Sequence, residues 1–238
     1  MKKVEKPLLC ANWKENKDIS EAENWIAVVG EKVSQIGKPI IVCVPFPFVF
    51  SLYKEISQKG WRDLVYLSAQ DVSRFEEGAH TGEVAAEMLS PACKFCLVGH
   101  SERRKYFGET DSDVIEKLKN LQEAKITPIL CLADLSQLGF YLKSIPQLES
   151  SEAILVYEPP DAISGGGEYH PKDPKEVDSE IGQIKEKIGL KLVLYGGSVN
   201  PKNISQFLEE PNVDGALIGQ ASLDPQSFLT LFQKACML

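Results

Sequence analysis

The sequence lacks an apolar run long enough to cross a membrane. Its longest apolar stretch, Pro39 to Phe50, carries three prolines, whereas a spanning helix needs about 20 consecutive apolar residues. The segment from Met1 to Pro7 has basic residues, but no apolar core of the signal-peptide type follows it. We therefore expect a protein that has no membrane partner and that stays in the cytoplasm.

Excess basic charge is also absent. The chain has 26 Lys and Arg residues against 34 Asp and Glu residues, which gives a net charge of -8. Non-specific nucleic-acid binding depends on a basic surface, so the composition disfavours nucleic acid as a partner. An anionic ligand would have to be held by a local positive group, because the overall field repels it.

The six cysteines do not make up a complete metal site. Cys93 and Cys96 have the spacing of one CxxC pair, but the sequence contains no second pair. Four of the six fall within apolar runs, where a free cysteine behaves as a small buried hydrophobe: Cys10, Cys43, Cys96 and Cys131. The pattern indicates buried thiols rather than a metal or redox site.

The sequence does contain one repeated unit. Short apolar runs recur along its whole length, and their continuous rather than alternating apolarity is typical of strands covered on both faces. The eight predicted strands are Leu8–Ala11, Ile40–Val44, Leu64–Leu67, Phe95–Val98, Pro128–Cys131, Ala153–Tyr157, Leu192–Tyr195 and Ala216–Ile218.

Helical patterns with recognisable start signals lie between these runs. Ser20–Glu23 has the pattern of a capping box, and Thr110 precedes an amphipathic segment. Three further starts place a capping residue before a proline: Asp173-Pro174, Asn200-Pro201 and Asp224-Pro225.

Strand and helix alternate eight times, which favours a single-domain (β/α)₈ barrel over residues 1–238. A doubly wound sheet is the alternative, but it usually carries a GxGxxG turn after its first strand, and none is present here. Only Asp134–Ser144 remains for the fifth helix. We therefore expect that helix to be shortened or irregular.

Polar residues gather where the predicted strands end. Catalytic groups of such barrels lie on the loops at these carboxyl ends. The ends supply an ammonium, an imidazole and a carboxylate, from Lys14, His100 and Glu158, together with loops suited to an anion. This set is suited to moving protons next to a carbonyl of a phosphorylated small molecule.

Six motifs in order, each assigned to a strand end, resemble the triosephosphate isomerase family over essentially the whole chain. They are Cys10–Lys14, Gly78–Val84, Val98–Arg104, Gly108–Asp111, Tyr157–Pro159 and Tyr195–Val199. The resemblance implies a TIM barrel that interconverts dihydroxyacetone phosphate and D-glyceraldehyde 3-phosphate through an enediol(ate), as in glycolysis and gluconeogenesis. It implies no cofactor and no metal.

The resemblance also implies roles for five catalytic residues. Glu158 would be the base that carries a proton between adjacent carbons, and burial under a closing loop would raise its pKa. His100 would be the neutral electrophile that polarises the carbonyl. Lys14 would supply positive charge, with Asn12 orienting it and Glu102 supporting it.

The substrate and phosphate site implied by the resemblance comprises Asn12, Lys14, Ser164, Ser198, Gly219 and Gln220, with Asn12 either orienting Lys14 or hydrogen-bonding the substrate oxygen. Ser164 and Gln220 stand where the family usually has glycine, and a positive φ at Gln220 would cost about 1 kcal/mol. Asp161, in the segment that resembles a mobile lid, replaces a usual tryptophan. These departures leave two alternatives open: an isomerase for another small sugar phosphate, or a non-catalytic barrel that serves as a binding or scaffold protein.

The segment Gln70–Val84 resembles the loop that family members insert into a neighbouring subunit. The resemblance therefore implies a homodimer, with a tetramer left possible by the compact chain.

Overall fold

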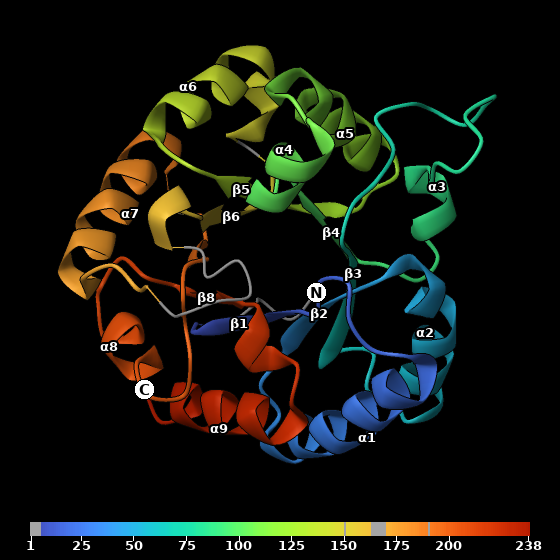
Figure 1. The fold of residues 1–238 in the computed structure, drawn as a ribbon, viewed down its shortest axis with the longest axis vertical. Helices are drawn as coiled ribbons and strands as arrows, with labels where there is room; N and C mark the ends of the chain where they lie inside the picture. Colours follow the sequence, from blue (N-terminus) through green and yellow to red (C-terminus); the bar gives the residue numbers. More distant parts are fainter. Residues whose placement is uncertain (1–5, 150, 163–169, 190) are drawn as a thin grey trace.

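The structure, a computed structural model, describes residues 6–149, 151–162, 170–189 and 191–238. Its parallel strands close into a barrel in which each strand pairs with its neighbours in sequence and β1 pairs with β8 (Figure 1). The strands are β1 Leu8–Asn12, β2 Ile40–Val44, β3 Val65–Ala69, β4 Phe95–Val98, β5 Thr127–Leu132, β6 Ile154–Tyr157, β7 Val193–Tyr195 and β8 Gly215–Ile218.

Helices connect the strands and form a ring around the barrel (Figure 1), which confirms the predicted (β/α)₈ fold. The α-helices are α1 Ile19–Ile36, α2 Val49–Gln58, α3 Ala86–Leu89, α4 Ser101–Phe107, α5 Asp111–Glu123, α6 Leu135–Ser144, α7 Pro174–Ile188, α8 Ile204–Leu208 and α9 Pro225–Cys236. Short 3-10 helices are η1 Phe46–Phe48, η2 Pro146–Leu148, η3 Pro160–Ala162 and η4 Gln220–Ser222.

The strands are apolar without alternation because both of their faces are buried. In β2, Ile41 and Cys43 belong to the cluster that fills the barrel. Ile40, Val42 and Val44 of the same strand belong to the larger cluster between the barrel and the helices. Side chains alternate along a strand, so two apolar clusters require a continuous apolar run.

The predicted helix starts were right where a capping side chain reaches the first turn. Thr110 caps α5 through Asp113, and Asp173 and Asp224 cap α7 and α9 ahead of a proline.

Two predicted starts were wrong. The α1 capping box is formed by Asp18 and Glu21 rather than by Ser20, because the Asp18 carboxylate reaches the Glu21 N–H and the Glu21 carboxylate reaches back. Asn200 opens a turn instead of a helix: its N–H donates to Asn203 Oδ1, and α8 begins only at Ile204.

The fifth helix occupies the short segment predicted for it. α6 has 10 residues and is followed by η2, and it is shorter than α1, with 18, or α7, with 15. It is regular rather than irregular, because Asp134 caps it by accepting from the N–H groups of Ser136 and Gln137. Among the described residues, no helix is long and apolar enough to span a membrane.

Candidate active site

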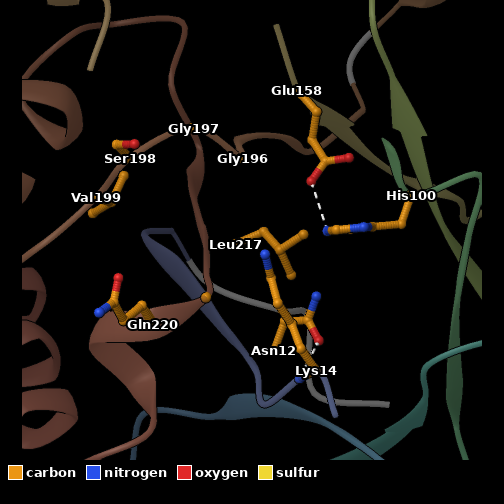
Figure 2. Close-up of a pocket in the computed structure, with 11 residues that line it drawn as sticks. Asn12, Lys14, His100, Glu158, Gly196, Gly197, Ser198, Val199, Leu217 and Gln220 are labelled. Atoms are coloured by element: carbon orange, nitrogen blue, oxygen red, sulfur yellow. Dashed lines mark hydrogen bonds and ion pairs between the residues drawn. The ribbon is translucent and has the colours of Figure 1, made fainter. Parts of the chain in front are cut away.

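A pocket opens at the carboxyl ends of β1, β4, β6, β7 and β8, as the strand-end argument predicts. Figure 2 shows Glu158 and His100 on one side of it, Asn12 and Lys14 below them, and Ser198 and Gln220 on the opposite side. The lining residues are Asn12, Lys14, His100, Glu158, Gly196, Gly197, Ser198, Val199, Leu217, Gly219 and Gln220.

Glu158 and His100 form a buried pair. Glu158 follows β6 directly, and its Oε1 lies 3.0 Å from His100 Nε2. The other ring nitrogen of His100, Nδ1, accepts the Glu102 N–H at 3.2 Å, so His100 caps α4. A nitrogen that accepts a hydrogen bond carries no proton, which puts the single proton of a neutral ring on Nε2, facing Glu158.

Each member of this pair shifts the pKa of the other. Burial raises the pKa of Glu158, but His100, the Ser101 N–H and the Cys131 thiol stabilise the carboxylate, and the net direction is down. Burial lowers the pKa of His100, but Glu158 raises it, and the net direction is up. The sequence analysis predicts a raised pKa for Glu158 once a loop closes over it. Residues 163–167 of that loop lie outside the described residues, so the raised pKa stays a prediction.

Lys14 is held in the pocket by three neighbours. Its Nζ lies 2.6 Å from Glu102 Oε1, its N–H donates to Asn12 Oδ1 at 3.0 Å, and its carbonyl accepts from Gln70 Nε2 at 3.0 Å. Lys14 has a φ of 52°, in the left-handed region that L residues rarely adopt. The structure thus brings Asn12, Lys14 and Glu102 together, as predicted.

Of the residues predicted to hold phosphate, Ser198 and Gln220 lie across the pocket from Glu158 and His100, whereas Gly219 lies beside Lys14 (Figure 2). Ser198 is buried, and its Oγ donates to the Ala162 carbonyl at 2.8 Å. Gly219 passes beside Lys14, since a Cβ there would lie 3.2 Å from Lys14 Cε. Gln220 begins η4 and is exposed. Ser164 lies outside the described residues.

Gln220 does not carry the strain that a positive φ would impose. Of the described non-glycine residues, Lys14, Lys17 and Lys125 have positive φ, and Gln220 does not. Because the φ of Gln220 is not positive, the strain of about 1 kcal/mol considered for this residue does not arise.

Sequence reasoning missed three residues that shape the pair. Gly196 leaves room for the base, because a Cβ there would lie 2.6 Å from Glu158 Cγ. The Ser101 N–H donates to Glu158 Oε2 at 3.2 Å, and the Cys131 thiol donates to the same carboxylate. The Gly-Gly pair after β7 was the sequence signal that could have pointed to Gly196. Ser101 and Cys131 contact Glu158 only because the fold brings them close to it, so the sequence carried no signal for their roles.

All six cysteines are free. Burial raises the pKa of Cys93 to about 12 and that of Cys96 well above its usual range. Both thiols of the CxxC pair therefore stay protonated, which argues against a reactive thiolate there.

The fold and the pocket define a (β/α)₈ barrel with an acid–base pair and a cation at its carboxyl face. The family model described as triosephosphate isomerase matches residues 7–235. The chain is 39% identical to the triosephosphate isomerase of Thermus thermophilus, covering 96% of this chain and 98% of that protein. It is 35% identical to that of Endomicrobium trichonymphae, again covering 96% and 98%.

A solved triosephosphate isomerase structure from Bartonella henselae has the same fold. Its TM-score is 0.80 at 24% sequence identity, with 96% of this chain and 98% of that chain covered. The family match and the near-full-length relatives settle the family: the chain belongs to the triosephosphate isomerases.

Proposed function

We propose that the protein interconverts dihydroxyacetone phosphate and D-glyceraldehyde 3-phosphate through an enediol(ate), the reaction of glycolysis and gluconeogenesis. The observation that carries this proposal is the buried Glu158–His100 pair, at 3.0 Å, in a pocket that Lys14 also lines. A carboxylate, a ring N–H and an ammonium are the groups that proton transfer beside a carbonyl requires.

Glu158 would begin the reaction as the base. Its carboxylate takes a proton from C1 of dihydroxyacetone phosphate, the C–H electron pair forms the C1–C2 double bond, and the carbonyl π pair moves onto the C2 oxygen. The lowered pKa of Glu158 keeps it ionised and ready to accept a proton in the absence of substrate.

His100 would stabilise that oxygen by donating its Nε2–H. In the described arrangement this N–H faces Glu158, so the substrate oxygen must take the place of the carboxylate. The raising effect of Glu158 on the pKa of His100 then weakens, while burial continues to lower it. Burial then favours the neutral ring, which is the form that polarises the carbonyl by donating a ring N–H.

The second half of the reaction returns the proton to the adjacent carbon. Protonated Glu158 delivers it to C2, His100 transfers the C1 hydroxyl proton to the C2 oxygen by giving up its Nε2 proton there and taking one from the C1 oxygen, and the C1 aldehyde forms. Lys14 supplies the positive charge that an anionic intermediate and a phosphorylated substrate need in a chain with a net charge of -8. Backbone N–H groups near Ser198, Gly219 and Gln220 would hold the phosphate.

A coupled assay for triose-phosphate interconversion on purified protein tests the proposal. We expect turnover in both directions and, in D₂O, exchange of the transferred proton with solvent. Activity on a different small sugar phosphate alone would favour the substrate alternative, since exposed Gln220 lines the pocket. Binding without turnover of any of these would favour the non-catalytic barrel.

We also propose a homodimer. The segment between β3 and α3 extends away from the barrel (Figure 1), and there Phe75 stacks on His80 with ring centroids 4.1 Å apart. A groove of about 900 Å³ beside Lys14 and His100 is lined by exposed aromatic side chains, including Tyr106 and Phe107. Exposed apolar patches of this kind mark interaction sites.

The segment of one copy would fill the groove of the other in an isologous pair. Light scattering at micromolar concentration should give the mass of two chains. A mass of four would show the tetramer, and a mass of one chain would contradict association.

We expect the protein to act in the cytoplasm. Its free thiols fit a reducing compartment, and glycolysis supplies the proposed substrate there. Fractionation of the source cells would test this location.

A further inference from the structure

A hydrogen-bond network lies behind the pocket, centred on Arg104 of α4. Its guanidinium donates to the Gly99 carbonyl at 3.0 Å, to the Asp111 carboxylate at 2.7 Å and to the Tyr141 hydroxyl at 2.6 Å. Tyr141 is fully buried, at 0% exposure. The planar guanidinium of Arg104 thus donates three hydrogen bonds to acceptors in three places: the loop after β4, helix α5 and helix α6.

The network continues from Asp111 to the end of β5. The Tyr141 hydroxyl donates to Asp111 Oδ1 at 2.6 Å, and Gln137 Nε2 donates to the same oxygen at 3.0 Å. Gln137 Oε1 then accepts the Ala133 N–H at 2.8 Å. A continuous path of hydrogen bonds therefore joins the backbone at Gly99 to the backbone at Ala133.

Those two backbone positions adjoin the reacting pair. Gly99 immediately precedes His100. Ala133 follows Leu132, whose carbonyl accepts the Glu158 N–H at 2.8 Å, and Cys131, whose thiol donates to the Glu158 carboxylate. The strand ends are also in close contact, because a Cβ on Gly99 would lie 3.2 Å from the Cys131 carbonyl oxygen.

We propose that Arg104, Asp111 and Tyr141 are positioning residues that fix the separation between His100 and Glu158. The inference rests on the proposed function for its effect on turnover. A displacement of about 1 Å in a catalytic group can cost about 100-fold in rate. A bond between a charged group and a buried hydroxyl resists such a displacement, since an unpaired partner would be left without solvent.

Tyr141→Phe removes one hydroxyl and keeps the ring that fills the core. It leaves Arg104 without one acceptor and Asp111 without one donor. We expect kcat to fall about three- to tenfold with KM unchanged within about twofold, because the phosphate contacts lie on the other side of the pocket. Tyr53→Phe is the matched control: among the described residues no hydrogen bond of its hydroxyl is present, and we expect the parent rates.

A second measurement separates positioning from stability. The Glu158 charge raises the pKa of His100, so the titration midpoint of His100 by NMR reports their separation. We expect Tyr141→Phe to shift the His100 midpoint, and Tyr53→Phe to leave it at the parent value.

Gln137→Met provides an independent break in the path, on a partly exposed side chain, should Tyr141→Phe fail to fold. We expect the same loss in kcat and the same shift of the His100 midpoint. A folded variant with reduced stability but parent kcat and parent His100 midpoint would overturn the inference. If the parent itself lacked isomerase activity, the proposed function would fail, and the His100 midpoint would still test the positioning.

Discussion

Replacing Glu158 by glutamine tests the centre of the proposed chemistry. Glu158→Gln keeps the shape of the side chain and an oxygen that can accept the Ser101 N–H. The amide has no negative charge and cannot take a proton from carbon. General-base catalysis contributes about 10²- to 10⁴-fold, so we expect kcat to fall by at least that factor, or about 2.7–5.4 kcal/mol of activation free energy.

The same variant should change how His100 binds a proton. Burial lowers the pKa of His100 and the Glu158 carboxylate raises it, so the midpoint should move to more acidic pH in the variant. The sign for stability follows by linkage. In the parent, the raised pKa stabilises the fold below the unfolded pKa of about 6.5, and this contribution is lost as pH rises through the folded pKa. The variant should lose this pH dependence.

The assays are the coupled isomerase assay, an NMR titration of His100 and urea unfolding at several pH values. Glu123→Gln, an exposed change at the end of α5, is the matched control and should behave as the parent. Activity of Glu158→Gln within a few-fold of the parent would refute the assignment of the base. An unchanged His100 midpoint would refute the pairing.

Two further substitutions test the walls of the pocket. Gly196→Ala places a Cβ 2.6 Å from Glu158 Cγ and from Val156 Cγ1. We therefore expect a loss of about 1–3 kcal/mol in the free energy of unfolding measured with urea, together with a lower kcat. Unchanged values would show that the backbone at Gly196 can move to accept a Cβ without disturbing Glu158. Gln220→Gly should bind inorganic phosphate at least as tightly as the parent in calorimetry, because Gln220 already has an unstrained φ, whereas a tenfold weaker Kd, about 1.4 kcal/mol, would identify the side chain as a ligand.

The barrel was predictable because each strand is buried on both sides. The bounds of β2 and β4, Ile40–Val44 and Phe95–Val98, are those the apolar runs predict. The start of α1 was not predictable from the capping pattern alone, since Asp18 and Ser20 both have capping side chains. Only the backbone geometry decides which of them reaches the first turn.

The main site residues were predictable for a topological reason. Parallel strands all end at one face of a closed barrel, so polar residues at strand ends must converge there, and Lys14, His100 and Glu158 do. Gly196 was predicted to lie on the rim, but its role in making room for Glu158 was not predicted, and Tyr141 was not found as part of the site. A glycine has no side chain to indicate what it makes room for, and Tyr141 acts only through partners that lie 30 and 37 positions away.

Lys14 illustrates how several strands together fix one cation. Its left-handed φ of 52° costs about 1 kcal/mol or more for a residue with a side chain. The cost is offset by neighbours from three strand ends: Asn12 at the end of β1, Gln70 after β3, and Glu102 on the helix after β4. Because the strain and the bonds that offset it come from different parts of the chain, the position of the ammonium depends on closure of the barrel. Any change that loosens the contacts of Lys14 with Gln70 and Glu102 should therefore weaken substrate binding before it unfolds the protein.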